Sequence, residues 1–380
     1  MKKITSAIFL IFIIISCKEE TPKDYYSIKG KIKNYNGTIY LNRELHSNYY
    51  LDNFKLDSVG VLEKATVVNG EFEFKLSKKY NIPFLFHLGT DNTKTSSFIL
   101  DTKNQQIIID SLYFNVKPQI ICENSTILNE ELLLDKRNTP ALEEFKFKFN
   151  KIKEADFPKD SIEKLMISAR KKLTDKNILI LKDFTINHPN SYVSFWYIVR
   201  NQMYNGYNIE LEKAYNNLSN TIKQSKVAKV FEKSMLEAKT LHNGTAFPEI
   251  KLKNKELKEI NFNAFKNSDS KYILVDFWFS YCGPCIAQFP KLKELQKKYS
   301  QNQLKIISIS TDKTKNVDNW FKVVDREKIT WLNLLDENGA ETSVLGINKF
   351  PTNYLLNKEG IILERDISLI ELEELLNKKN

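Results

Sequence analysis

The sequence is poor in the residues on which several classes of protein depend. It has four cysteines and four histidines in 380 residues, and only six of its 57 basic residues are arginine. Four cysteines in so long a chain exclude a disulfide-stapled scaffold. Few arginines argue against a nucleic-acid reader, because such proteins use arginine for bidentate contacts with bases and phosphates. The net charge of +10 therefore indicates a lysine-rich solvated surface, and no nucleic-acid partner is expected.

Length and composition indicate a globular protein of more than one domain. A chain of 380 residues is too long for one typical core, and its hydrophobic content of 42% is that of a folded protein. The histidines stand alone, so His46, His87 and His188 are interpreted as structural. No second cysteine pair or histidine pair exists at the spacing of metal ligands. We therefore expect neither a metal nor another cofactor.

The chain begins with an export signal that ends in a cysteine. Two lysines precede an almost wholly apolar run, Ile4–Ile15, and Ser16-Cys17 closes it. The run is too short to cross a bilayer comfortably, which favours a cleaved signal. Its ending resembles a bacterial lipobox, which implies a signal peptide over residues 1–17 and a lipid anchor on Cys17. A plain signal peptide with a chance cysteine is the alternative.

Residues 18–24 are polar and without pattern, and are interpreted as a tether. The acidic pair Glu19-Glu20 resembles signals that send some lipoproteins to the outer surface. We therefore expect a lipid-anchored protein of the cell envelope that faces the periplasm, with display on the outer membrane as the alternative. Outside the inner membrane the cytosolic thiol buffer is absent, so a cysteine pair there needs dedicated exchange partners.

Residues 25–125 are expected to form an antiparallel β-sandwich-like domain. Ile28, Gly30 and Ile32 alternate with lysines before Asn36-Gly37, which predicts a hairpin with a type I′ turn. The same pattern recurs around Asn69-Gly70. Further strands are predicted over residues 84–88, 97–100 and 106–109. Regular short strands separated by turn residues are typical of a sandwich.

Cys122 lies in the apolar context Gln119–Glu123 and is interpreted as a buried, inert thiol. With Leu56-Asp57-Ser58 ahead of Asn69-Gly70, the region loosely resembles the β domain of unknown function that precedes a thioredoxin domain in exported bacterial lipoproteins. The resemblance implies an accessory or binding role and no catalytic residue.

Residues 126–242 are predicted to be a helical segment. Apolar residues recur at helical spacing from Ile162 to Leu173 and again from Val227 to Ala238. A helix is also expected over residues 192–203. Its aromatic run Phe195-Trp196-Tyr197 is interpreted as core, with the lining of a ligand site as the alternative. We expect this segment to be a spacer packed between the other two domains.

Residues 243–380 are predicted to form an α/β domain. The run from Tyr272 to Phe277 is apolar except for Asp276, as in a strand buried on both faces of a parallel sheet. A helix is expected after Cys282, with Phe289 and Leu292 inward. Further strands are predicted over residues 249–252, 259–262, 304–310, 352–356 and 361–364, and helices over residues 316–324 and 369–377. Alternating strands and helices favour this class.

Cys282-Gly283-Pro284-Cys285 follows the buried strand directly. Cys282 is expected to begin a helix, where unpaired N–H groups and the helix dipole stabilise a thiolate. The thiolate is the nucleophilic form of cysteine. Cys285 stands one turn further, close enough to resolve a mixed disulfide. A zinc site lacks two ligands, and a structural disulfide across so small a loop would stabilise little. The pair therefore indicates redox chemistry.

The segment from Val275 to Cys285 resembles the active site of the thioredoxin family. Asp276 stands at the family's buried acid, Trp278 at its active-site tryptophan, and Pro290 at the proline that kinks the next helix. The run Gly346–Thr352, with Phe350-Pro351, is similar to the loop whose proline is cis and faces the cysteines. The anchor and the lead-in over residues 243–262 resemble the TlpA and ResA branch of envelope thiol-disulfide oxidoreductases.

This resemblance implies a redox disulfide between Cys282 and Cys285 and roles for the residues around it. Asp276 would have a raised pKa and take the Cys285 proton. Pro351 would offer the neighbouring backbone to an extended substrate peptide. Trp278, Gly283, Pro284 and Phe350 would support the site. Gln288 stands where the branch usually has a glutamate, so Asp276 would act alone.

Two hypotheses follow. The first is a membrane-anchored enzyme that reduces disulfides of envelope proteins, draws electrons from a membrane thiol reductant and, by analogy with its branch, serves cytochrome c maturation. The Gly-Pro between the cysteines favours reduction. The second is a binding lipoprotein whose β domain captures a ligand or partner, with an auxiliary thioredoxin fold. A peroxidase is a distant alternative, because a Pro and a Thr are missing ahead of Cys282, where Ser280 is the only nearby aliphatic hydroxyl.

Overall fold

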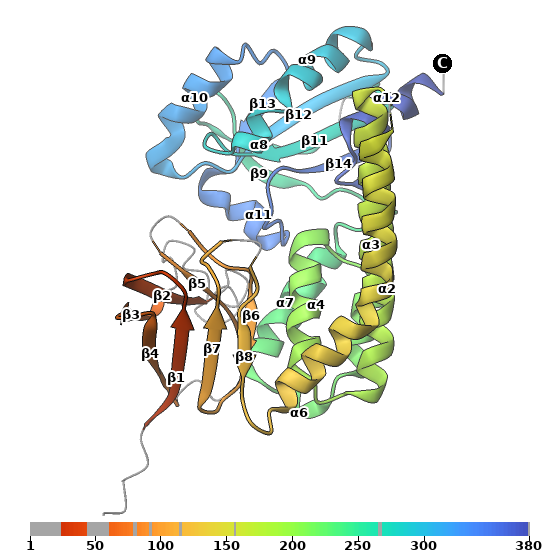
Figure 1. Ribbon diagram of the computed structural model, residues 1–380. Coiled ribbons are helices and arrows are strands. Elements are labelled where there is room, and N and C mark those ends of the chain that lie inside the picture. Colours follow the sequence, from red (N-terminus) through yellow and green to blue (C-terminus); the bar gives the residue numbers. More distant parts are fainter. Residues whose placement is uncertain are drawn as a thin grey trace, which may run out of the picture.

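The computed structural model describes residues 24–43, 61–78, 82–90, 93–113, 116–155, 157–264 and 268–378. Figure 1 shows three parts: a strand-rich region, a helical segment beside it and a C-terminal α/β domain above both. The predictions for Cys17, the signal peptide, His46 and Leu56-Asp57-Ser58 lie outside these residues. Among the residues described, no helix is long and apolar enough to cross a membrane.

The N-terminal strands form two four-stranded sheets, ordered β4-β1-β7-β8 and β3-β2-β5-β6. The strands are β1 (Tyr25–Ile32), β2 (Gly37–Arg43), β3 (Val61–Val67), β4 (Glu71–Ser77), β5 (Phe84–Gly89), β6 (Phe98–Leu100), β7 (Gln105–Ile109) and β8 (Gln119–Ile121). Side chains of both sheets share one buried cluster, as expected of a sandwich. The pairings are antiparallel except that of β1 with β7, which is parallel.

The hairpin predicted at Asn36-Gly37 is wrong, because β1 and β2 belong to different sheets. Asn36 instead accepts a hydrogen bond from the Asn69 backbone N–H at 2.9 Å, so the chain crosses from one sheet to the other beside the second turn. At that turn Asn69 and Gly70 have positive φ, and Val68 and Glu71 exchange both backbone hydrogen bonds. The turn chemistry is confirmed, but β3 and β4 then enter different sheets.

The helical segment shares its core with the strands. Its helices are α2 (Thr126–Glu154), α3 (Lys159–Asn187), α4 (Tyr192–Asn205), α5 (Ile209–Asn217), α6 (Asn220–Lys223) and α7 (Lys226–Lys239). Phe195 and Trp196 are fully buried, and the Trp196 indole donates to the Pro83 carbonyl at 2.7 Å. Phe195 and Trp196 are therefore core, as predicted, and join α4 to the sandwich, whereas Tyr197 is half-buried at the edge of this core.

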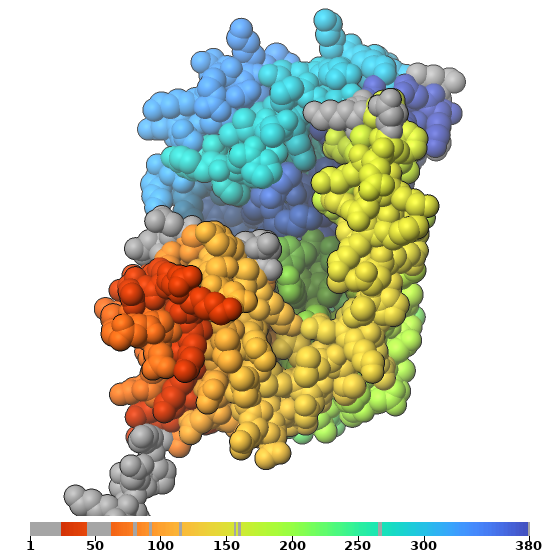
Figure 2. Space-filling model, in the orientation of Figure 1, coloured from red at the N-terminus to blue at the C-terminus, as the bar shows by residue number. Residues whose placement is uncertain are grey.

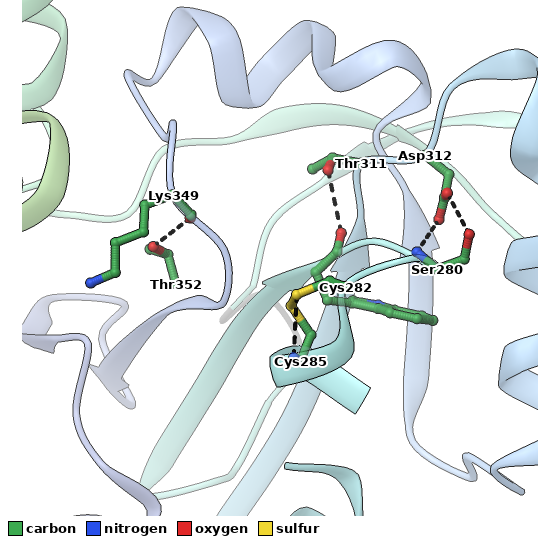
Figure 3. Close-up of a disulfide and its surroundings, with 8 residues drawn as sticks. Ser280, Cys282, Cys285, Thr311, Asp312, Lys349 and Thr352 are labelled. Carbon is green, nitrogen blue, oxygen red and sulfur yellow. Dashed lines mark hydrogen bonds between the residues drawn. A yellow bond between two sulfur atoms is a disulfide. The ribbon is translucent and has the colours of Figure 1, made fainter. Parts of the chain in front are cut away.

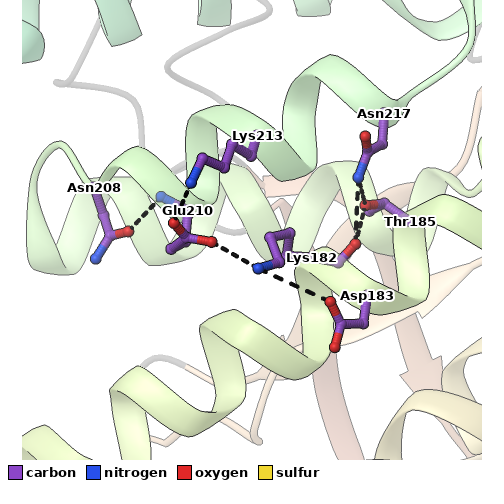
Figure 4. Close-up of polar contacts among 7 residues, drawn as sticks. All are labelled: Lys182, Asp183, Thr185, Asn208, Glu210, Lys213 and Asn217. Atoms are coloured by element: carbon purple, nitrogen blue, oxygen red, sulfur yellow. Dashed lines mark hydrogen bonds and ion pairs between the residues drawn. The ribbon is translucent and has the colours of Figure 1, made fainter.

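Polar contacts hold α3 against α5 (Figure 4). Lys182 pairs with Glu210 at 2.7 Å, and the Asn217 amide donates to the Thr185 hydroxyl at 3.0 Å. The N-terminal half of α3 reaches the C-terminal domain (Figures 1 and 2). There Lys164 pairs with Glu374 at 2.5 Å and Lys171 pairs with Glu364 at 2.9 Å. The segment thus contacts both other parts of the chain.

The C-terminal domain is built on a seven-stranded sheet of order β10-β9-β13-β12-β11-β14-β15. Its elements are β9 (Ile250–Lys253), β10 (Glu259–Phe262), β11 (Tyr272–Trp278), α8 (Gly283–Ile286), α9 (Phe289–Lys298), β12 (Leu304–Ser310), the 3-10 turn η1 (Thr314–Asn316), α10 (Val317–Arg326), β13 (Leu332–Leu335), the 3-10 turn η2 (Glu337–Gly339), α11 (Ala340–Val344), β14 (Thr352–Asn357), β15 (Ile362–Arg365) and α12 (Leu369–Asn377). Every residue of β11 is buried.

The predicted strands and helices of this domain are confirmed, and β13 and α11 are additional. The central strands β11, β12 and β13 are parallel, while β14 and β15 are antiparallel. A sheet of this order covered by helices is the thioredoxin-like fold. Since β11 lies inside the sheet, between β12 and β14, the loop after Trp278 emerges away from both lateral ends of the sheet.

Candidate active site

The cysteine pair lies where the central strand turns into a helix (Figure 3). Cys282 occupies the N-cap position of α8, and its sulfur accepts a hydrogen bond from the Cys285 backbone N–H at 3.2 Å. The two cysteines form a disulfide with their Cα atoms 5.2 Å apart. The same N–H group would stabilise a Cys282 thiolate after reduction.

The site is open on one side and closed on the other. Gly283 and Pro284 are exposed, and Tyr281 is 64% exposed. The cysteines themselves are only 4% and 2% exposed. Trp278 is fully buried behind them and contacts the Phe289 ring edge-on at a centroid distance of 5.0 Å. The side of Tyr281, Gly283 and Pro284 is therefore open to a substrate.

The expected cis peptide bond is found between Phe350 and Pro351. Because Thr352 pairs with Phe277 in antiparallel register, Pro351 comes level with Trp278 at the same end of the sheet. The Phe350 ring packs edge-on against Phe279, 5.4 Å between centroids, in the loop that leads to Cys282. The structure thus brings the two predicted segments together.

Asp276 lies on the sheet face that carries the cysteines. Its neighbours at alternate positions, Leu274 and Trp278, belong to the buried cluster that contains Cys282 and Cys285. Asp276 is 3% exposed. Burial raises the pKa of its carboxyl to about 7, and a hydrogen bond from Ser308 partly opposes that rise. A carboxyl group with such a pKa can both accept and release a proton near neutral pH.

Sequence reasoning missed Asp312, which fixes the loop before Cys282 from behind. Its buried carboxylate accepts the Ser280 backbone N–H at 2.8 Å, the Ser280 hydroxyl at 2.7 Å and the Ser310 hydroxyl at 2.7 Å (Figure 3 shows the contacts with Ser280). We call these three residues the collar of the site. The place of Asp312 in the sequence could have indicated this role, because it directly follows β12. The parallel pairing of β12 with β11 brings the ends of both strands to one edge of the sheet.

The structure also places Pro290, Gln288 and Cys122, which were singled out in the sequence. The helix after Cys282 is interrupted at Ala287-Gln288, and Pro290 is the second residue of α9, so the expected kink is present. Gln288 is half-buried. Cys122 is half-buried rather than buried, and burial raises the pKa of its thiol, which keeps it in the unreactive form. No cluster of metal-binding side chains exists among the residues described.

Comparison with known proteins agrees with this geometry. Residues 243–365 match the model of the AhpC/TSA family. The thiol-disulfide oxidoreductase ResA of Oceanobacillus iheyensis is 29% identical over 139 residues, which is 35% of this chain and 71% of ResA. ResA of Bacillus thuringiensis is 28% identical over 36% of this chain and 77% of its own length.

Solved structures match as well. The thioredoxin domain of a thiol-disulfide oxidoreductase from Bacteroides vulgatus is 25% identical, with a TM-score of 0.32, over 37% of this chain and 99% of that domain. A thioredoxin-like protein from Bacteroides caccae is 18% identical, with a TM-score of 0.41, over 57% of this chain and 85% of its own.

A nucleophilic cysteine at a helix start, a resolving cysteine one turn on and a buried acid below them are the parts that dithiol–disulfide exchange needs. The two ResA proteins to which this part of the chain is similar are thiol-disulfide oxidoreductases. The C-terminal part of this chain is therefore a thioredoxin-like thiol-disulfide oxidoreductase domain.

Proposed function

We propose that this chain is a lipid-anchored reductase of disulfides in proteins of the cell envelope. The observation that carries the proposal is the Cys282–Cys285 pair at the start of α8, above the buried Asp276. The Gly-Pro between the cysteines favours reduction over oxidation, since it is the pairing of thioredoxin. Disulfides in exported proteins are the substrates, and the disulfide of oxidised apocytochrome c is among the candidate clients.

The reaction begins with the reduced pair. The Cys282 thiolate attacks one sulfur of the client disulfide, which forms a mixed disulfide and releases the client's other sulfur as a thiolate that takes up a proton. The Cys285 thiol gives its proton to Asp276 and attacks the Cys282 sulfur. This step re-forms Cys282–Cys285 and releases the second client thiolate. Two electrons pass from the enzyme to the client.

The N-terminal sequence supports the location. The apolar run Ile4–Ile15 followed by Ser16-Cys17 is suited to export and lipidation, and residues 18–24 would tether the folded part to the bilayer. An exported reductase loses its electrons with each turnover, so it needs a membrane thiol reductant that reduces Cys282–Cys285 again.

Disulfide reduction by the purified full chain in detergent tests the enzyme. Wild type should reduce a disulfide-bonded protein when supplied with a dithiol, and Cys282→Ser should abolish the rate. Cys122→Ser is the matched control, because it removes a half-buried thiol far along the sequence from the pair, and its rate should equal that of wild type. An unchanged rate in Cys282→Ser would overturn the proposal and favour a binding lipoprotein.

Client capture in cells tests the location and the partners. Cys285→Ala leaves the attacking cysteine but removes the resolving one, so mixed disulfides should accumulate on Cys282. The captured proteins should be exported proteins and should be absent from a Cys282→Ser strain. Cys17→Ala should release the chain from the membrane fraction. Captured cytosolic proteins, or Cys17→Ala in the membrane fraction, would contradict the envelope location.

A further inference from the structure

Asp276 is flanked by a polar side chain on each neighbouring strand. The register pairs it with Ser308 on β12 and with Asn353 on β14. Ser308 is fully buried and Asn353 is 7% exposed. Paired residues on adjacent strands present their side chains on one face, so all three lie together beneath the cysteine pair. We call these three residues the floor of the site.

Ser308 is oriented as a donor. The Trp331 indole N–H donates to the Ser308 hydroxyl oxygen at 2.8 Å, and both residues are buried. An indole can only donate, so the Ser308 oxygen must accept and its own hydrogen is directed elsewhere. Because the strand register places Ser308 beside Asp276, that hydrogen is available to the Asp276 carboxyl. A donor on a carboxyl group favours the ionised form.

Asn353 is oriented as an acceptor. Its amide nitrogen donates to the Ile367 carbonyl at 3.0 Å, which leaves the side-chain oxygen on the other side of the amide. That oxygen is buried and has no hydrogen-bond partner within the described part of the chain. An unpaired buried acceptor is costly, and protonated Asp276, at the paired position on β11, is a donor that would satisfy it. An acceptor next to a carboxyl group favours the protonated form.

The geometry points to a two-sided proton site in which Ser308 holds the ionised form of Asp276 and Asn353 holds the protonated form. This inference rests on the proposed function, because it concerns the resolving step. As Cys285 gives up its proton, Asp276 passes from the form held by Ser308 to the form held by Asn353. The proton leaves again once the disulfide has formed. Ser308 and Asn353 are positioning residues, since they act through Asp276.

Other charged groups lie too far or face elsewhere. The titratable members of the buried cluster are Cys282, Cys285, Tyr272 and Tyr299. Asp312 lies two residues beyond the end of β12, and its carboxylate is bound by Ser280 and Ser310. Lys305, three residues before Ser308 on the same strand, faces the opposite side of the sheet. No charged side chain contributes to the pKa shift of Asp276.

The test is the titration of Asp276 in the oxidised full chain, where neither active-site cysteine titrates. Carboxyl ¹³C shifts of aspartate-labelled protein are followed against pH, and Asp276→Asn identifies the signal. Ser308→Ala should move the inflection to higher pH and Asn353→Leu to lower pH, each by roughly half to one pH unit. Ser308→Thr, which keeps the hydroxyl, should titrate as wild type does.

Asn42→Leu is the matched control. It removes a buried amide from β2 in the N-terminal sandwich, outside the sheet that holds Asp276, and should leave the inflection unchanged. If Asn353→Leu does not fold, Asn353→Ala replaces it. Shifts in the same direction for Ser308→Ala and the Asn353 variant, or no shift in either, would overturn the inference. The titration needs no turnover, so its outcome is separate from that of the disulfide-reduction assay.

Discussion

The floor and the collar of the site each centre on a buried carboxylate, but they are built in opposite ways. Asp312 in the collar accepts three hydrogen bonds from two serines. Asp276 in the floor has one hydroxyl donor and stands beside an amide whose free group is an acceptor. A carboxylate saturated with donors is a fixed anchor, whereas one with mixed partners can exchange a proton. We therefore assign the chemistry to the floor and the geometry of the loop to the collar.

The largest expected effect is on the pH dependence of stability. The pKa of Asp276 is about 7 in the folded protein and roughly 3.9 in the unfolded chain. This difference in pKa corresponds to a change of roughly 4 kcal/mol in the unfolding free energy. Since the folded pKa is the raised one, this stabilisation is complete below about pH 4 and is lost as pH rises to about 7. Asp276→Asn has no carboxyl group to ionise, so its unfolding free energy does not fall in this way. Relative to wild type, the unfolding free energy of the variant should therefore rise by roughly 4 kcal/mol between pH 4 and 8.

Denaturant unfolding of the oxidised proteins at pH 4.5, 6 and 8, followed by tryptophan fluorescence, measures this difference. Asp325→Asn, an exposed acid at the end of α10, is the control and should track wild type within about 0.5 kcal/mol at every pH. A constant gap between Asp276→Asn and wild type across the three pH values would show that Asp276 does not titrate in this range.

The next effect is on turnover. Asp276→Asn cannot take the Cys285 proton, so resolution of the mixed disulfide at pH 7 should slow by roughly a hundredfold. Attack by Cys282 should change much less, because its thiolate is held by the Cys285 backbone N–H. Rapid mixing with a labelled client disulfide separates the two steps. Equal slowing of both would mean that the carboxyl acts on the pair as a whole and not on Cys285.

The collar should show the reverse pattern. Asp312→Asn places an amide donor against three groups that all donate, so at least one buried donor loses its partner. We expect the domain to lose roughly 1–3 kcal/mol of unfolding free energy. The difference from wild type should be similar at pH 5 and pH 8, unlike that of Asp276→Asn. A loss smaller than that of Ser280→Ala, which removes only one of the donors, would contradict the anchoring role.

The same contrast explains what could be predicted from the sequence. Asp276 stood out because it is the one acid in an otherwise apolar strand, and Cys282-Gly283-Pro284-Cys285 is contiguous. Asp312 did not stand out, because its partner Ser280 is 32 residues away and meets it only through strand pairing. Asn353 and Ser308 likewise become neighbours of Asp276 only once the order of strands is known.

The strand pairing of the N-terminal sandwich could not be predicted for the same reason. Asn69-Gly70 makes the tight turn that its residues favour, because turn chemistry is local. The partner of each strand is not local: β1 pairs with β4 and β7, and the neighbouring β2 goes to the other sheet. Alternation of apolar residues specifies which face of a strand is buried, and it does not specify the strand beside it.

The smallest effect separates the floor from ordinary core packing. Trp331 and Trp320 both belong to the cluster around the cysteines, and each donates its indole N–H to a buried acceptor, Ser308 at 2.8 Å and Asn333 at 3.0 Å. Replacing either tryptophan by phenylalanine removes one hydrogen bond and some apolar contact, so both variants should lose a similar unfolding free energy.

Only Trp331→Phe frees the Ser308 oxygen and lets its hydrogen leave Asp276. The carboxyl titration should therefore move to higher pH, by less than in Ser308→Ala, in Trp331→Phe and stay in place in Trp320→Phe. Equal shifts in the two variants would mean that loosened packing, and not the direction of one hydroxyl, sets the pKa of the floor.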